Sequence, residues 1–173
     1  MIGGKPRGSL PGSDCGSVYQ GGAEKSSTRL WFLWVNLRRS LRVRAWNILS
    51  LREDDHLSLL SSELKHLTIG IATLSEVRRA DCGEIIVGGC TYYWSGHSDG
   101  YHAQGVAVAV SNKLTPMIFE GTPVNERIMR LRIRHSLGVI SLVSVYAPTE
   151  ASDLTVKDAF YATLESVVDQ CPR

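Results

Sequence analysis

Polar side chains that could hold a cation follow two short apolar stretches of the sequence. Asn47 comes directly after residues 41–46, and Glu76 follows residues 69–74 by one residue. A carboxylate at the end of a buried strand is costly unless it is solvated, paired or bound to a cation. Carboxylate and amide oxygens are ligands that suit Mg²⁺. The residue types therefore predict a Mg²⁺ site made by Asn47 and Glu76.

The same two residues also have an ordinary structural interpretation. Glu76 is close in sequence to Arg78 and Arg79, and it could simply form an ion pair with one of them. Asn47 would then only turn the chain. Spacing alone does not decide between these interpretations.

Tyr146 is a candidate for contact with a phosphate group. It follows the apolar stretch 138–145 and precedes Ala147 and Pro148, where proline stops a strand from continuing. A phenol in this place can donate a hydrogen bond to a phosphate oxygen or stabilise a developing oxyanion. The alternative is a buried tyrosine whose hydroxyl has an ordinary partner.

A row of arginines is the candidate nucleic-acid contact. Apolar and basic residues alternate along residues 128–134, so the basic side chains share one face of a predicted strand. Guanidinium groups in a row can follow phosphates, although they can also form a solvated face. The predicted contacts are Arg127, Arg130, Arg132 and Arg134. Neither the histidines nor the cysteines have the spacing of a zinc site.

The elements that position Asn47 and Glu76 form a strand–helix–strand unit. Residues 41–46 alternate as a strand does, residues 55–67 carry leucines at steps of three and four, and residues 69–74 form a short apolar run. A helical connection makes the two strands parallel. Because parallel strands end at the same edge of a sheet, Asn47 and Glu76 should lie close together.

The rest of the chain indicates an α/β protein. Strands are expected over residues 91–94, 105–110, 117–119, 127–134 and 138–145, and a helix over residues 155–171. The stretch 138–145 is apolar on both faces, which favours a central strand.

Composition limits the possible classes of protein. The chain has 173 residues, of which 43% are hydrophobic and 21% charged, and this argues against a wholly disordered or fibrous protein. No apolar run is long enough to span a bilayer, and none resembles a secretory signal. We therefore expect a nuclear or cytoplasmic protein with no membrane partner. The sequence does not determine the oligomeric state.

The first 40 residues differ from the rest. Residues 1–28 hold seven of the sixteen glycines, and we expect this segment to be disordered. Residues 29–40 combine aromatic side chains with three arginines, which is typical of a basic arm or of a solvated tail. The expected organisation is a Gly/Ser-rich and basic segment at 1–40 and a folded domain at 41–173.

Three short motifs together resemble a known family. Trp46–Asn47, Leu74–Ser75–Glu76 and Tyr146–Ala147–Pro148 have the order and spacing of motifs in the endonuclease/exonuclease/phosphatase superfamily. The segments around residues 92–96, 104–108 and 125–129 resemble the endonuclease domain of non-LTR retrotransposons. The resemblance covers about residues 41–173 and includes one departure, Ser75, where the wider family has glutamine.

The resemblance implies a two-sheet α/β sandwich and a Mg²⁺-dependent phosphodiesterase that nicks DNA. It assigns Asn47 and Glu76 to the metal and Tyr146 to the scissile phosphate. The family's later motifs, G-D-x-N and S-D-H, have no match in the 173 residues. We therefore expect a domain truncated at its C-terminal side and a chain that is inactive by itself. The alternative is a non-catalytic fragment that binds nucleic acid or protein.

Overall fold

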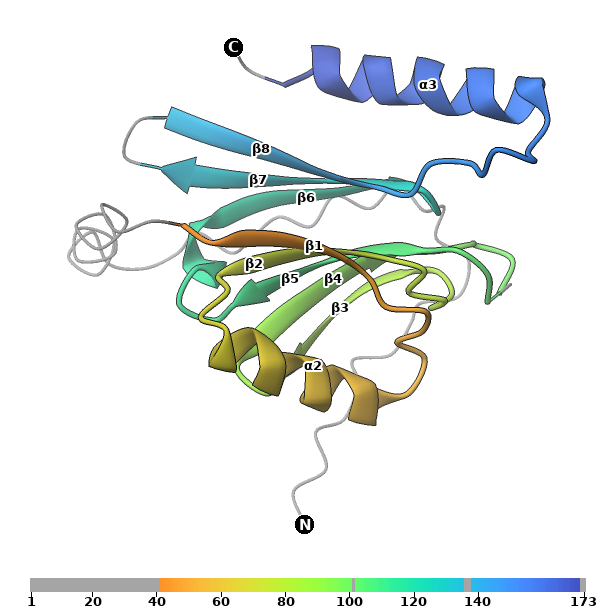
Figure 1. Ribbon diagram of the computed structural model, residues 1–173. Helices are drawn as coiled ribbons and strands as arrows, with labels where there is room; N and C mark the ends of the chain where they lie inside the picture. Colours follow the sequence, from red (N-terminus) through yellow and green to blue (C-terminus); the bar gives the residue numbers. More distant parts are fainter. Residues whose placement is uncertain (1–40, 101, 136–137, 172–173) are drawn as a thin grey trace.

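The computed structural model describes residues 41–100, 102–135 and 138–171, and the predictions made for residues 1–40 lie outside this part. The described chain forms strands, two α-helices and a short 3₁₀ helix (Figure 1). In chain order the elements are β1 (Val43–Asn47), α2 (Asp54–His66), β2 (Ile71–Ser75), β3 (Cys82–Val87), β4 (Cys90–Ser95), β5 (Val106–Ser111), η1 (Thr115–Met117), β6 (Ile118–Asn125), β7 (Ile128–His135), β8 (Gly138–Val145) and α3 (Leu154–Asp169).

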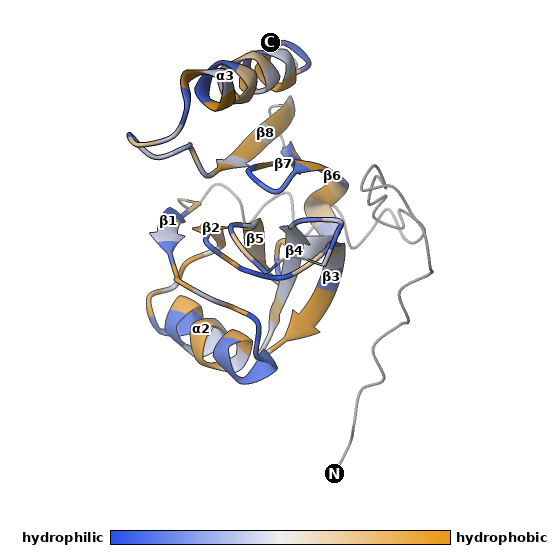
Figure 2. Cartoon of the chain, turned by 90° about the vertical axis from the view of Figure 1, so that its right-hand side faces the viewer, coloured by the Kyte–Doolittle hydropathy of each residue, from blue (hydrophilic) through white to orange (hydrophobic). Residues whose placement is uncertain are grey.

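The strands form two sheets that face each other. The first has the order β1-β2-β5-β4-β3, in which β1 and β2 are parallel and the other pairs are antiparallel. The second is the antiparallel sheet β6-β7-β8. Helix α2 covers the outer face of the first sheet and α3 the outer face of the second (Figures 1 and 2). This arrangement confirms the predicted two-sheet α/β sandwich.

The first sheet buries both of its faces, one against α2 and the other against the second sheet, because alternate residues of each strand point to opposite faces. In β5, Ala107 and Ala109 point toward α2, whereas Val106 and Val108 point into the space between the sheets. The small alanines let α2 approach the sheet, and its buried Leu57 packs there. Burial on both faces explains why β5 is apolar throughout.

The parallel pair that the sequence predicted is present. Strands β1 and β2 are in register from Val43 opposite Ile71 to Asn47 opposite Ser75. Helix α2 connects them. Because the helix packs across the sheet, it carries the chain back to the edge where β1 began, and β2 then runs in the same direction as β1. Asn47 and Glu76 are consequently brought to one edge.

One expectation about strands was wrong, and one strand was not predicted. Residues 138–145 form β8, which lies at the edge of the described sheet and not at its centre. It is apolar on both faces because one face of the second sheet packs on the first sheet and the other face lies under α3. Strand β3, which contains Gly83 opposite Trp94, was not predicted.

Candidate functional site

Glu76 is the centre of a polar cluster built from both sheets. Its Oε1 accepts hydrogen bonds from Asn47 Nδ2 at 2.6 Å and from the Tyr146 hydroxyl at 3.3 Å. Its Oε2 accepts a hydrogen bond from Arg78 Nη2 at 3.2 Å. Asn47 ends β1, Glu76 and Arg78 follow β2, and Tyr146 follows β8. The carboxylate therefore has one partner 29 positions before it in the sequence and another 70 positions after it.

The chain after β2 is bent so that Glu76 can reach this position. Glu76 and Arg78 have φ angles of 58° and 55°, in the left-handed region that is uncommon for residues other than glycine. Main-chain bonds fix the bend, because Arg78 N donates to Gln104 O at 2.7 Å and Leu51 N donates to Val77 O at 2.8 Å. Such conformations are often found at functional sites.

The cluster favours a charged Glu76 beside a neutral Tyr146. The hydrogen bond from Asn47 is the main cause that holds the pKa of Glu76 below its usual value; burial opposes it, and Tyr146 and Arg78 add to the lowering. Burial, together with the Glu76 carboxylate, raises the pKa of Tyr146. At neutral pH the site therefore contains an anionic acceptor and a phenol that can donate its proton to a hydrogen bond.

The donor set of Asn47 and Glu76 fits a hard divalent cation. Both supply oxygen, and Glu76 Oε2 accepts one hydrogen bond, which leaves it a free lone pair. Asn47 Oδ1 accepts the Leu49 N–H at 3.2 Å and keeps further acceptor capacity. Mg²⁺ commonly takes one or two protein oxygens and completes its shell with water and phosphate. In the described chain, no three His, Cys, Asp or Glu side chains are grouped as a metal site.

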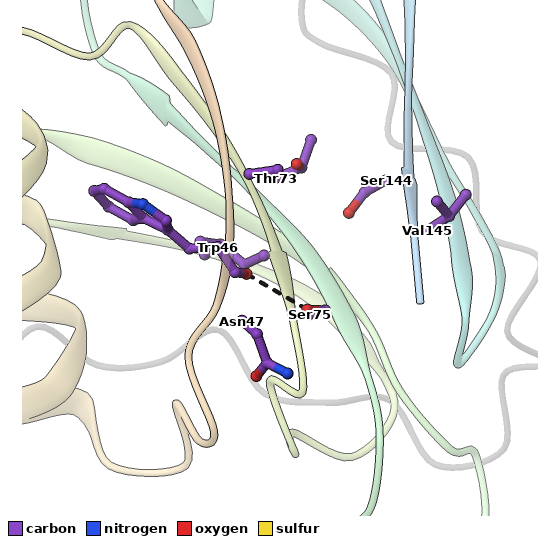
Figure 3. Close-up of a pocket in the computed structure, with 8 residues that line it drawn as sticks. Trp46, Asn47, Thr73, Ser75, Ser144 and Val145 are labelled. Carbon is purple, nitrogen blue, oxygen red and sulfur yellow. Dashed lines mark hydrogen bonds between the residues drawn. The ribbon is translucent and has the colours of Figure 1, made fainter. Parts of the chain in front are cut away.

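A cavity of about 180 Å³ lies beside Asn47, between the two sheets. Figure 3 shows Trp46, Asn47, Thr73 and Ser75 on one side, and Ser144 and Val145 of β8 on the other. The Ser75 hydroxyl donates to the Trp46 carbonyl at 3.5 Å. The Ser75 side chain therefore bonds to the neighbouring strand β1. Asn47 and Tyr146, rather than Ser75, orient the Glu76 carboxylate.

The arginines predicted to contact nucleic acid are divided by the structure. Arg127 lies next to Tyr146, with its Nη1 donating to the Tyr146 carbonyl at 3.2 Å. Arg130 and Arg132 instead lie on the α3 side of β7, where each donates to Glu120 at 2.9 Å. Arg134 is exposed, with its guanidinium 5.2 Å from the centre of the Phe119 ring. Contact with nucleic acid stays a prediction for all four residues.

Arg78 is the site residue whose importance was missed. Arg78 was predicted only as a competing partner of Glu76. The structure shows that pair, while Arg79 pairs with Asp54 at 3.1 Å. The side chain of Arg78 is nevertheless 45% exposed and points its charge into the cluster. Its position two residues after Glu76 was the available signal.

Comparison with known proteins supports the fold. No family model matches the chain. Over 131 residues it is 23% identical to craniofacial development protein 2 of Bos taurus. The matched segment covers 76% of this chain and 22% of that protein. The crystal structure of the AP endonuclease LMAP from Leishmania major matches with a TM-score of 0.57 and 15% identity, over 84% of this chain and 56% of that one.

The chain thus spans about a fifth of the curated relative and little more than half of the structural neighbour. None of the helices in the described ranges is long and apolar enough to cross a membrane. The chain therefore has a two-sheet α/β sandwich fold like that of this AP endonuclease.

Proposed function

We propose that this chain carries the metal- and phosphate-binding part of a Mg²⁺-dependent DNA endonuclease of non-LTR retrotransposon origin. One observation carries the proposal: Asn47, Arg78 and Tyr146 converge on the Glu76 carboxylate from three segments at 2.6–3.3 Å. The retrotransposon origin is proposed because the motifs around these residues resemble those of non-LTR retrotransposon endonucleases. DNA is proposed as the substrate because the fold is similar to that of an AP endonuclease.

Asn47 and Glu76 would hold the Mg²⁺ ion. When bound, the ion would neutralise charge on a phosphate group and polarise its P–O bonds. The protonated Tyr146 hydroxyl would donate to a phosphate oxygen, because burial, together with the neighbouring Glu76 carboxylate, keeps the pKa of Tyr146 raised. Arg78 is exposed enough to pair with the same phosphate, and its guanidinium geometry suits that contact.

Hydrolysis also needs a group that orients the attacking water. The bonds around Glu76 include no second carboxylate among the described residues. The 173 residues contain no match to G-D-x-N or S-D-H. We therefore propose that residues 1–173 bind Mg²⁺ and DNA but hydrolyse the phosphodiester bond at most slowly, since loss of a general base alone costs about 10²–10⁴-fold in rate.

Binding of a fluorescent DNA duplex, measured by anisotropy with and without Mg²⁺, tests the proposal. We expect Mg²⁺ to strengthen binding by the wild-type chain and to have no effect on Glu76→Gln. Glu63→Gln, an exposed change on α2, is the matched control and should behave as wild type. Binding that does not depend on Mg²⁺ in any variant would refute the metal site.

A plasmid-nicking assay tests the second half of the proposal. The wild-type chain with Mg²⁺ should nick no faster than Glu76→Ala or an EDTA-treated sample. Nicking by the wild type that both controls abolish would show that these residues suffice for catalysis. The chain would then be a complete endonuclease.

A further inference from the structure

Arg127 forms two hydrogen bonds with the main chain of Tyr146. The Tyr146 N–H donates to the Arg127 carbonyl at 2.8 Å, and Arg127 Nη1 donates to the Tyr146 carbonyl at 3.2 Å. Tyr146 lies just beyond β8, and Pro148 has no N–H with which the ladder could continue. The contacts from Arg127 are therefore what fixes the chain where it leaves the sheet.

The same guanidinium packs against the Tyr146 ring. Its central carbon lies 5.4 Å from the ring centre, within the range of a cation–π contact. Arg127 is itself held in place. Its Nε lies 3.8 Å from Glu126 Oε1, and its main-chain N–H donates to Asn125 Oδ1 at 2.9 Å. The turn between β6 and β7 thus presents a fixed cation to Tyr146.

Burial separates the role of Arg127 from that of Arg78. The side chain of Arg127 is 14% exposed, whereas that of Arg78 is 45% exposed. A residue that contacts DNA phosphates needs a guanidinium that can be reached from solvent. In Arg127, Nη1 instead donates to the Tyr146 carbonyl, and the guanidinium charge lies beside Glu126 and the Tyr146 ring.

We infer that Arg127 is a positioning residue, which holds the Tyr146 hydroxyl against Glu76. Its catalytic meaning rests on the proposed function, in which Tyr146 contacts the phosphate. The geometric claim stands apart from that function: without Arg127, the Tyr146 ring should move away from Glu76. A residue of the β6–β7 turn thereby sets the geometry at the end of β8 and, through Tyr146, at the end of β2.

NMR spectra of the chain labelled with ¹³C-tyrosine test this inference without DNA or metal. Tyr146→Phe identifies the Tyr146 signal, and the exposed Tyr161 serves as an internal reference. In Arg127→Gln, we expect the Tyr146 signal to move toward that of free tyrosine while the Tyr161 signal stays. The Tyr146 amide proton keeps its acceptor, the main-chain carbonyl of residue 127, but it should exchange about tenfold faster because loss of the guanidinium bond to the Tyr146 carbonyl lets this part of the chain open more often.

Arg127→Lys keeps the charge but cannot both donate to the Tyr146 carbonyl and cover the ring. We expect it to shift the Tyr146 signal part of the way. Arg134→Gln is the matched control, because it removes another arginine that packs on a ring, that of Phe119. It should leave Tyr146 unchanged.

An unchanged Tyr146 signal in folded Arg127→Gln would overturn the inference. If Arg127→Gln does not fold, an Arg127→Lys spectrum identical to wild type would do the same. The DNA-binding assay is independent of these spectra. Failure of the proposed function would leave the NMR result standing, and failure of the NMR test would leave the metal site untouched.

Discussion

At the scale of single residues, the site depends on donors that surround one carboxylate. Asn47 approaches Glu76 more closely than Tyr146 or Arg78 does, and its hydrogen bond is the largest single cause of the lowered Glu76 pKa. The amide of Asn47 is oriented in turn by the Leu49 N–H. A carboxylate held in this way is ionised before any cation arrives, which lowers the cost of binding one.

Tyr146→Phe removes one of these donors and keeps the ring. We expect the free energy of unfolding to fall by about 0.5–1.5 kcal/mol, the usual net worth of a hydrogen bond. Urea denaturation measures the change. Tyr161→Phe is the control, because Tyr161 is 60% exposed, and it should be neutral. Equal stability of wild type and Tyr146→Phe would mean that the 3.3 Å bond to Glu76 contributes nothing.

Glu120→Gln tests a second carboxylate cluster, in which Glu120 is half-buried. Burial would raise the pKa of Glu120, but the hydrogen bonds from Arg132, Thr122 and Arg130 outweigh it and lower the pKa below 4.5. A carboxyl whose pKa is lower in the folded state stabilises the protein above its unfolded pKa. That stability is lost as the pH falls through the folded pKa.

At pH 7, we therefore expect Glu120→Gln to unfold with a free energy about 1.5–3 kcal/mol lower than wild type, the range for bonds to charged groups. The difference should shrink as the pH falls below 4.5. Urea denaturation at a series of pH values measures it, with the exposed Glu63→Gln as control. A difference that does not depend on pH would contradict an ionised, paired Glu120.

At the scale of elements, α2 is what makes β1 and β2 parallel neighbours. Its buried stripe includes Leu57 and Leu64, and the Ser61 hydroxyl lies 2.8 Å from the Tyr92 hydroxyl and donates to Val87 O at 2.9 Å. Helix α2 is therefore tied to both β3 and β4 as well as to the strands that it connects. Loosening α2 should loosen the edge that carries Asn47 and Glu76.

Leu57→Ala tests the packing of α2. Leu57 is 1% exposed, so we expect the free energy of unfolding to fall by about 2–5 kcal/mol because a cavity is left behind. Leu59→Ala, on the exposed side of the same helix at 67%, should change it by less than about 0.5 kcal/mol. Thermal or urea denaturation of both variants measures the contrast. Similar losses of unfolding free energy in both variants would contradict the packing of the Leu57 face of α2 on the sheet.

At the scale of the whole molecule, β8 is an unprotected edge. Within the described ranges it pairs only with β7, and it contains no charged residue. Val139, Ile140 and Val145 are 39–42% exposed. An apolar edge strand with unpaired main-chain groups is a surface on which other strands can add. We expect the chain to associate with itself as its concentration rises.

Val139→Glu should reduce that association. The new carboxylate would lie opposite Arg134 in the register of β7 and β8, and it would place a charge at the free edge. Sedimentation velocity over a range of concentrations measures the effect. Leu59→Glu changes an exposed apolar residue away from any sheet edge and is the control. Equal association by wild type and Val139→Glu would exclude the β8 edge as the contact.

The local pattern of the sequence determined which segments form the first strands and helix and how they are connected. Apolar alternation, the leucine stripe of residues 55–67 and the short run before Glu76 predict a parallel pair, and Asn47 and Ser75 are indeed opposite each other. This could be predicted because the period of each segment depends only on neighbouring residues. The motifs around Glu76 and Tyr146 likewise indicated the fold type.

The tertiary structure alone decided which side chains meet. Glu76 and Tyr146 are 70 residues apart, and only the packing of one sheet on the other brings them together. The strand pairing within the second sheet places Arg127 against Tyr146 and sets Arg130 and Arg132 beside Glu120, although all of these arginines look alike in sequence. It also places β8 at an edge despite its apolar pattern. Burial by another layer and burial by a neighbouring strand select the same residue types, so the sequence cannot distinguish them.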